Sequence, residues 1–230
     1  MIRIYGVRLS DLPEQRLLEA FLKPYLGDSW RARHQGTRGM APLASLGGAF
    51  LLQCARLRGE LACDGLGRPR LMGSNVDFSI THTDRAVFCA VAEMPVCVGG
   101  AFSMQRLFAG EARVGLDAEN DSRILGERTA AIAARWFTEA EQRQMAADVE
   151  GKAFLRIWTR KEALVKWLGV GMAGLRDADT ALAEEQYGVH FFEYRHEDAL
   201  ITLCTHAGES HPERISMLSR EEIEEILQKS

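Results

Sequence analysis

The sequence predicts an α+β protein made of two similar α/β halves related by a pseudo-two-fold axis. Its composition, 47% hydrophobic and 26% charged over 230 residues, is that of a packed globular protein with room for one large domain or two small ones. A strand, helices and a strand hairpin occur in that order twice along the chain. We therefore expect an N-terminal half at residues 1–105 and a C-terminal half at residues 106–230, with the active site at their interface.

The net charge and the cysteine content limit the classes of binding partner and the cellular compartment that we expect. The net charge is −4, so no global positive field draws the chain onto nucleic acid or an anionic membrane, and any anion site must be local. The five cysteines are scattered, without C-x-x-C or zinc spacing, which indicates core thiols in a reducing compartment. Residues 1–8 lack the apolar run of a signal peptide, and no apolar stretch approaches about 18 residues. We expect a cytoplasmic protein, monomeric because two halves in one chain can complete a site.

Hydrophobic spacing and turn residues give the elements of the first half. We expect a strand at residues 2–7, a helix after Ser10, a loop over residues 30–40, a helix over residues 42–57 and a hairpin of residues 76–81 and 86–92. The loop is expected because two glycines lie among its basic residues.

The second half repeats this order. We expect a strand at residues 113–119, helices near residues 124–136, from Thr138 and over residues 153–168, strands near residues 189–194 and 200–205, and a final helix after Ser219. Thr138 with Glu141, and Ser219 with Glu222, have the spacing of capping boxes, so both helix starts are well marked.

Two acids alternate with apolar residues in the strand at residues 113–119. Val114, Leu116 and Ala118 fall on one face, and Asp117 and Glu119 fall on the other. Their backbones stand roughly 6.5 Å apart along the strand, so the two carboxylates could share one hard cation such as Mg²⁺. The alternative is a half-exposed strand with two solvated acids, since the pattern is short and common.

Charge interrupts the apolar stripe of the helix at residues 153–168. At about 100° per residue, Lys161 falls near the centre of the stripe, Glu162 at its edge and Lys166 one turn beyond Glu162. An ammonium in an apolar stripe is costly unless an anion compensates it, which favours a functional role. The alternative is a Lys161 that reaches water along the apolar surface, with Glu162 and Lys166 as a surface pair.

Two features of the first half offer groups that bind phosphate. His82 lies at the turn of the hairpin, and the hydroxyl residues beside it are Ser79, Thr81 and Thr83. The basic residues of the expected loop include Arg31, Arg33 and Arg38. The alternatives are an idle, exposed histidine and a solvated basic loop.

In order along the chain, these motifs resemble those of the 4′-phosphopantetheinyl transferase superfamily, in its longer form with two halves in one chain. Residues 114–119 (VGLDAE) are similar to the family's V-G-I-D-x-E strand, and residues 158–166 (WTRKEALVK) to its W-x-x-K-E-x-x-x-K helix, which Gly169 and Gly171 follow as its G-x-G. Residues 67–69 (GRP), 78–83 (FSITHT) and 135–141 (RWFTEAE) are similar to three further motifs. The resemblance covers about residues 67–172.

The resemblance implies an activity and a role for each residue. The chain would transfer the 4′-phosphopantetheine group of coenzyme A to a serine of an acyl or peptidyl carrier protein, with Mg²⁺, or Mn²⁺ in its place, held by Asp117, Glu119 and Glu162. Glu162, Lys166 and His82 would be catalytic, Glu162 by receiving the serine proton directly or through water. The donor would be bound by Arg31, Arg33, Arg38, Arg68, Thr81, His82, Lys161 and Lys166.

The chain also departs from the family pattern. Leu43 and Ala44 stand where the family often has a basic residue followed by a small hydroxyl residue. One alternative is therefore a non-catalytic relative that binds carrier proteins and has a decayed donor pocket. A second alternative is a Mg²⁺-dependent phosphohydrolase or nuclease, although the acidic net charge speaks against a nucleic-acid substrate.

Overall fold

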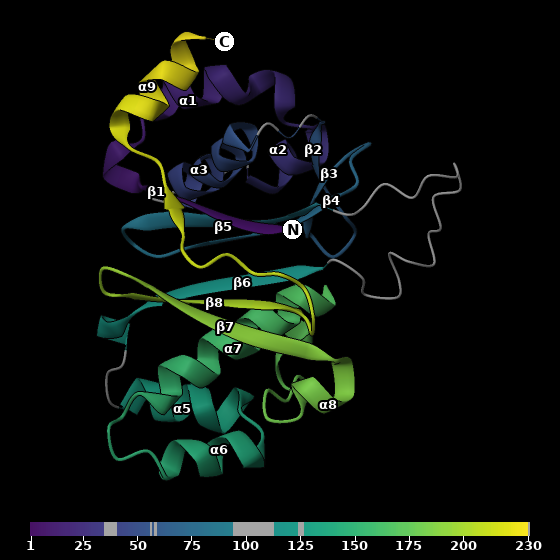
Figure 1. Cartoon of the computed structure of the whole chain (residues 1–230), viewed down its shortest axis with the longest axis vertical. Coiled ribbons are helices and arrows are strands. Elements are labelled where there is room, and N and C mark those ends of the chain that lie inside the picture. The colour runs from purple at the N-terminus through teal and green to yellow at the C-terminus, as the bar shows by residue number, and fades with distance from the viewer. Residues whose placement is uncertain (35–40, 56, 58, 94–112, 124–126, 230) are drawn as a thin grey trace. The chain divides into compact units, whose positions relative to one another are not determined.

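The computed structural model describes residues 1–34, 41–55, 57, 59–93, 113–123 and 127–229, and the chain divides into two compact units (Figure 1). Unit 1 comprises Met1–Val98 together with His211–Ser230, and unit 2 comprises Gly99–Ser210. Each unit contains helices and a sheet, which confirms the mixed α+β class. The pseudo-two-fold likeness of the two halves stays a prediction.

The C-terminal segment belongs to unit 1. The expected division gave residues 106–230 to one half, but in the structure residues 211–230 group with the N-terminal residues. The physical reason is pairing and burial, because Tyr5 lies opposite Ser216 in a parallel strand pair and Ile223 is buried in the unit 1 core. Unit 2 is therefore inserted in the sequence between two parts of unit 1.

Unit 1 contains most of the short elements. Its helices and strands are β1 (Ile2–Arg8), α1 (Gln15–Leu22), α2 (Asp28–His34), α3 (Ala41–Cys54), β2 (Leu61–Cys63), β3 (Pro69–Leu71), β4 (Val76–His82), β5 (Ala86–Glu93), β9 (Ser216–Met217) and α9 (Arg220–Gln228), with 3-10 turns at Leu9–Asp11 and Lys23–Tyr25. The main sheet has the order β4-β5-β1-β9, antiparallel except for the pair of β1 and β9, and β2 and β3 form a separate pair.

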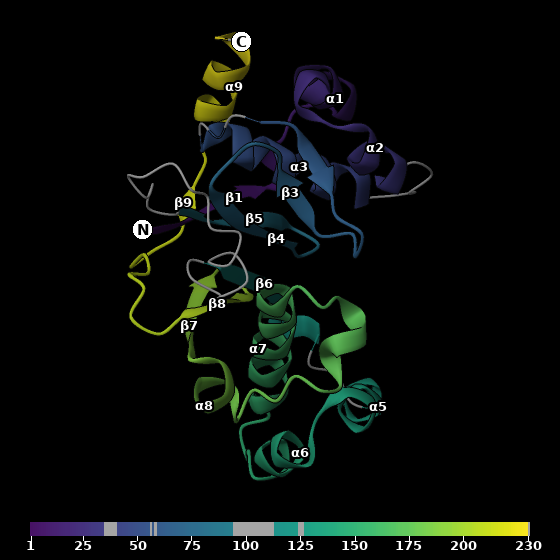
Figure 2. The same cartoon turned by 90° about the vertical axis from the view of Figure 1, so that its right-hand side faces the viewer.

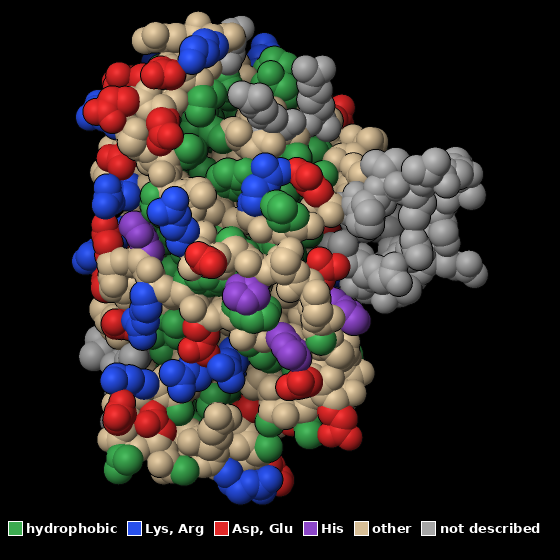
Figure 3. Space-filling view, in the orientation of Figure 1, with side chains coloured by type: hydrophobic (Ala, Val, Ile, Leu, Met, Phe, Trp, Pro, Cys, Tyr) green, Lys and Arg blue, Asp and Glu red, His purple; other side chains and the backbone are tan. Residues whose placement is uncertain are grey.

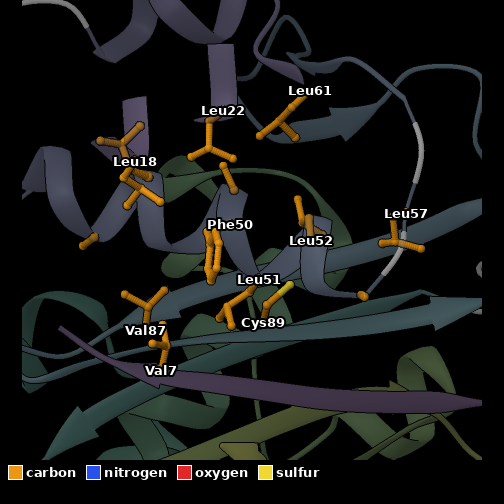
Figure 4. Packing of buried hydrophobic residues seen from close by; sticks show 14 of the residues in the cluster. Val7, Leu18, Leu22, Phe50, Leu51, Leu52, Leu57, Leu61, Val87 and Cys89 are labelled. Carbon is orange, nitrogen blue, oxygen red and sulfur yellow. The ribbon is translucent and has the colours of Figure 1, made fainter. Parts of the chain in front are cut away.

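The core of unit 1 lies between its main sheet and α3, with α1 on the far side of α3. Figure 4 shows Phe50 of α3 between Leu18 and Leu22 of α1 and the strand residues Val7 and Val87. All five of these side chains are inaccessible to solvent. Burying such side chains is the main term that stabilises the unit.

Unit 2 is a three-stranded antiparallel sheet covered by helices. Its elements are β6 (Val114–Asn120), α5 (Glu127–Trp136), α6 (Glu139–Ala146), α7 (Ala153–Leu168), α8 (Ala183–Tyr187), β7 (Val189–His196) and β8 (Ala199–His206), with 3-10 turns at Asp121–Arg123 and Met172–Leu175. The strand order is β6-β8-β7. The long helix α7 packs across β6 and β8 (Figure 2), and α6 packs against α7.

Most expected elements are confirmed, and both capping boxes are present at Thr138 and Ser219. The loop expected over residues 30–40 is wrong for residues 30–34, which belong to α2. Asp28 lies in the first turn of α2, and Trp30 is buried, so this segment forms a helix before the glycines at 36 and 39 are reached. Residues 35–40 lie outside the described part of the chain.

The surface carries charges of both signs. On the face drawn in Figure 3, Lys and Arg side chains are interspersed with Asp and Glu. Among the helices in the described ranges, none combines the length and the apolar character that crossing a membrane requires.

Candidate active site

The face of β6 that carries residues 115, 117 and 119 lies against α7. Gly115 allows this close approach, because a methyl group at residue 115 would overlap the carbonyl oxygen of Ala163 and lie 2.7 Å from the backbone nitrogen of Trp167. Strand alternation then places Asp117 and Glu119 on the same face of β6. The helix that carries Glu162 and Lys166 is thus held directly over the two acids.

Asp117 and Lys166 form an ion pair across this contact. The Nζ atom of Lys166 donates to Asp117 Oδ1 at 2.7 Å and to the carbonyl oxygen of Leu116 at 2.9 Å. The Asp117 side chain is 6% exposed and that of Lys166 is 30% exposed. Because one partner is buried and the other reaches solvent, the pair lies at the edge of unit 2, where a ligand phosphate could reach the ammonium.

Glu119 and Glu162 complete the carboxylate set. The indole nitrogen of Trp158 donates to Glu119 Oε1 at 3.2 Å. Trp158, Glu162 and Lys166 follow one another at intervals of four residues, so they lie along one stripe of α7. Since Trp158 and Lys166 both bind acids of β6, Glu162 lies on α7 between the two residues that contact the strand.

The donor set suits a hard divalent cation. Mg²⁺ usually binds through one or two carboxylates and completes its coordination with water and substrate phosphate. Asp117 and Glu119, on one strand face, could supply those carboxylate ligands. Within the described ranges, no three His, Cys, Asp or Glu side chains are grouped as metal ligands. In this structure the Lys166 ammonium binds Asp117. The three-ligand assignment to Asp117, Glu119 and Glu162 stays a prediction.

Lys161 lies in the interior of unit 2. Its side chain is 0% exposed and its Nζ donates to Glu141 Oε2 at 2.8 Å, while Glu141 is also 0% exposed. The ammonium therefore neither reaches water nor faces the same direction as Lys166. Its expected role in donor binding stays untested, but the structure gives it a partner within the protein.

In unit 1, two of the expected donor-binding arginines lie close together. The guanidinium of Arg33 lies over Gly67, where an added methyl group would be 2.8 Å from Nη2. The neighbouring Arg68 donates through Nη2 to both carboxylate oxygens of the buried Asp77, at 2.9 and 2.8 Å. Arg70 also reaches Asp77, at 3.2 Å. Asp77 therefore offsets the charge of Arg68 and fixes its direction.

The side chains of the hairpin and of the start of α3 do not converge on one phosphate site. Thr81 is 5% exposed, and His82, the next residue along β4, is exposed and on the opposite face of the strand. Leu43 packs against the core of unit 1 and Ala44 is buried within it. The two departures from the family pattern thus contribute to packing.

A surface cavity of about 460 Å³ lies beside Arg31. It is lined by Glu19, Lys23, Leu26, Trp30, Arg31, His34 and Leu46. Trp30 and His34 stack with ring centroids 4.0 Å apart, and Arg31 donates to the carbonyl oxygen of Lys23 at 2.8 Å. Two residues along a helix turn about 200°, so Arg31 and Arg33 project from opposite sides of α2. Arg38 lies outside the described residues.

The part of the chain that contains β6 and α7 matches a known protein family. Residues 113–215 match the model of the 4′-phosphopantetheinyl transferase superfamily. The chain carries a 4′-phosphopantetheinyl transferase superfamily domain. That transferase domain contains β6 and α7, and with them Asp117, Glu119, Glu162 and Lys166. The match supports phosphopantetheine transfer as the general function and a transferase as the class of enzyme. None of the curated proteins is similar enough to this chain to count as a match.

The sequence did not predict two contacts and one residue of a cavity. Glu141 was expected only as a capping residue, and its second role as the partner of Lys161 had no signal beyond the cost of an unpaired buried lysine. The bond from Trp158 to Glu119 joins two motifs of the transferase domain, and spacing alone does not reveal it. Lys23, in the cavity beside Arg31, carries no motif.

Proposed function

We propose that this chain transfers the 4′-phosphopantetheine group from coenzyme A to a serine of an apo acyl or peptidyl carrier protein, in a reaction that depends on Mg²⁺. The observation that carries the proposal is the contact between β6 and α7, which brings Asp117, Glu119 and Lys166 together inside the part of the chain that matches the transferase family. Acids that hold a metal beside a lysine are what a diphosphate donor requires.

The proposed reaction exchanges one phosphorus–oxygen bond for another. The serine oxygen of the carrier bonds to the phosphorus next to pantetheine, and the bond from that phosphorus to the bridging oxygen of the diphosphate breaks. The bridging oxygen leaves with its electron pair on adenosine 3′,5′-bisphosphate. The serine proton passes to the carboxylate of Glu162, directly or through a water that it orients.

Each residue of the transferase domain has a task in this proposal. A bound Mg²⁺ would supply charge neutralisation of the diphosphate, with Asp117, Glu119 and Glu162 as its ligands. Lys166 orients and neutralises a phosphate oxygen, and its 30% exposed side chain permits it to turn from Asp117 to the donor. Trp158 holds the Glu119 carboxylate in place through its indole nitrogen.

The proposed contacts in unit 1 are with the phosphate-bearing nucleotide end of the donor. Arg33 has an exposed guanidinium over Gly67, and Arg68 beside it is held in position by Asp77. Because Asp77 offsets the charge of Arg68, we assign it directional hydrogen bonding and assign charge neutralisation to Arg33. His82, Thr81, Arg31 and Arg38 complete the assignment.

The test is transfer of a label from coenzyme A to an apo carrier protein with Mg²⁺ present. We expect transfer by the wild type, strong loss in Asp117→Ala and Glu162→Gln, and wild-type rates in the control Arg143→Ala, whose side chain is 76% exposed on α6. Absence of transfer to fatty-acid, polyketide and peptide carriers, together with absence of coenzyme A binding, would refute the function. Transfer that survives both site substitutions would refute the residue assignment.

One observation favours a second candidate. Leu43 and Ala44 are packed in the core of unit 1 where the family often has polar residues, so a non-catalytic protein that binds carriers would explain them. Calorimetric titration with coenzyme A and with an apo carrier separates the two. Carrier binding without coenzyme A binding supports the second candidate, and binding of both supports the transferase.

A further inference from the structure

The most deeply buried charges of unit 2 are fully compensated. The Lys161 ammonium is bound by Glu141 Oε2 at 2.8 Å and by the carbonyl oxygen of Ala178. Glu141 Oε1 accepts from the backbone nitrogen and the hydroxyl of Thr180, at 2.9 and 2.8 Å, and Oε2 accepts from the nitrogen of Thr138 at 2.8 Å. Every one of these groups lies within unit 2, so the two charges are neutralised without a ligand.

The pair joins three separate segments of the chain. Glu141 is in the first turn of α6, Lys161 is in the middle of α7, and Ala178 and Thr180 lie between Leu175 and α8. Removing two charges from water costs several kcal/mol per ion, and a pair of well-packed apolar residues often serves stability equally well. Stability alone therefore does not explain a charged junction at this place, whereas a directional contact that fixes geometry does.

The junction holds α7 from the side opposite to β6. On one side, Ala163 and Trp167 pack against Gly115, which sets the distance from α7 to β6. On the other side, Lys161 ties the helix to α6 and to residues 178–180. Lys161 directly precedes Glu162 and is five residues before Lys166, so any rotation or sliding of α7 at the junction moves the residues proposed to act on the donor.

We propose that the Glu141–Lys161 pair is a positioning device for the active-site stripe of α7, and that Lys161 acts through the helix and makes no contact with the donor. This proposal rests on the proposed transferase function. It assigns Glu141 and Lys161 as positioning residues and leaves the phosphate contacts to Lys166. A displacement of about 1 Å in an active site can cost about 100-fold in rate, so a small change at the junction should have a large catalytic effect.

The first experiment detects displacement of the helix without measuring activity. Glu141→Asp withdraws the carboxylate by about 1.5 Å, the length of one carbon–carbon bond, and Lys161→Arg changes the donor geometry while keeping the charge. We expect both variants to shift the indole N–H resonance of Trp158 in a ¹H–¹⁵N spectrum, because that group donates to Glu119. Glu139→Asp, the same change at a 93% exposed position on α6, should leave the resonance in place.

Kinetics then separate positioning from mere support of the fold. At temperatures where all variants are folded, we expect Glu141→Asp to lower kcat at least tenfold and to change the KM for coenzyme A little. Only a displaced α7 explains such a loss in folded protein. A wild-type kcat together with an unmoved Trp158 resonance would overturn the proposal.

A double substitution separates positioning from donor contact. Lys161→Met alone leaves the Glu141 carboxylate buried without its cation, so we expect lower stability and activity. Adding Glu141→Gln removes that charge, and we expect stability to return while kcat stays low, because methionine cannot replace the directional bond from Lys161 to Glu141. We expect the double variant to bind coenzyme A as the wild type does in calorimetric titration. If Lys161 touched the diphosphate, the double variant would bind coenzyme A more weakly, which would overturn the proposal. Failure of the wild type to transfer would refute the proposed function, and the Trp158 resonance would still decide whether the pair positions α7.

Discussion

Gly115→Ala is the substitution that acts most directly on the contact between β6 and α7. The new methyl group would lie 2.7 Å from the Trp167 nitrogen, whereas ordinary contact begins at 3.4 Å, so the helix must move away by at least about 0.7 Å. The overlap with the Ala163 carbonyl oxygen adds to this displacement. Because both neighbours are backbone, no side-chain rotation relieves the contact.

We expect the displacement to lower both the stability of the protein and its kcat. Overpacking of a tight contact costs about 1–3 kcal/mol, and each kcal/mol lowers the Tm of a domain of this size by about 2–4 °C. Moving α7 outward also lengthens the 2.7 Å hydrogen bond between Lys166 and Asp117 towards or beyond the upper limit for a hydrogen bond. We therefore expect kcat to fall by about 10- to 100-fold, a larger effect than partial unfolding explains.

Thermal unfolding and label transfer to an apo carrier measure the two effects. Gly65→Ala is the matched control, since a methyl group there meets nothing within 4 Å, and it should leave both Tm and kcat unchanged. A Gly115→Ala protein with the wild-type Tm and kcat would refute the argument that α7 is packed against the strand at this glycine. A lower Tm with wild-type kcat would refute only the link to the active site.

Two further predictions concern pH and thiol chemistry. Hydrogen bonds, first from the Ala153 nitrogen at the start of α7, hold the pKa of Asp148 below its usual 3.8, so Asp148 stabilises the fold above that pH and less as pH falls through its lowered pKa. Asp148→Asn should thus lower the urea midpoint more near pH 7 than at about pH 3, and an equal effect at both would contradict this. Burial raises the pKa of Cys54 to about 12, and the pKa of the less buried Cys63 is also raised by burial. At pH 8 iodoacetamide should therefore label Cys63 before Cys54, as judged by peptide mass spectrometry, and the reverse order would contradict the burial.

Long periodic elements were predictable because their signals are local. The helix at residues 153–168 is found with those bounds, since its apolar stripe is long and Gly169 ends it in the left-handed region at φ 73°. The strand pair β2 and β3 and the two-residue β9 were not expected. Each is too short to show a period, and β9 depends on pairing with a strand at the other end of the chain.

The candidate site was predictable as a set of residues and not as a set of contacts. Motif order selected Asp117, Glu119, Glu162 and Lys166, and the structure brings the strand that bears the acids against the helix that bears the lysine. The apolar stripe also predicted that Lys161 needs an anion. It could not name Glu141, because the partner lies on another helix and the match depends on how α6 packs against α7.

The return of the chain to unit 1 has a consequence for the order of folding. Strand β1 precedes unit 2 in the sequence, yet its neighbour β9 and the core residue Ile223 follow unit 2. Loop closure over that separation delays pairing, so the β1 edge waits while the inserted transferase segment is synthesised. During that interval an open strand edge is available to other chains. Synthesis of residues 211–230, which follow the inserted segment, is therefore required before unit 1 can complete its sheet.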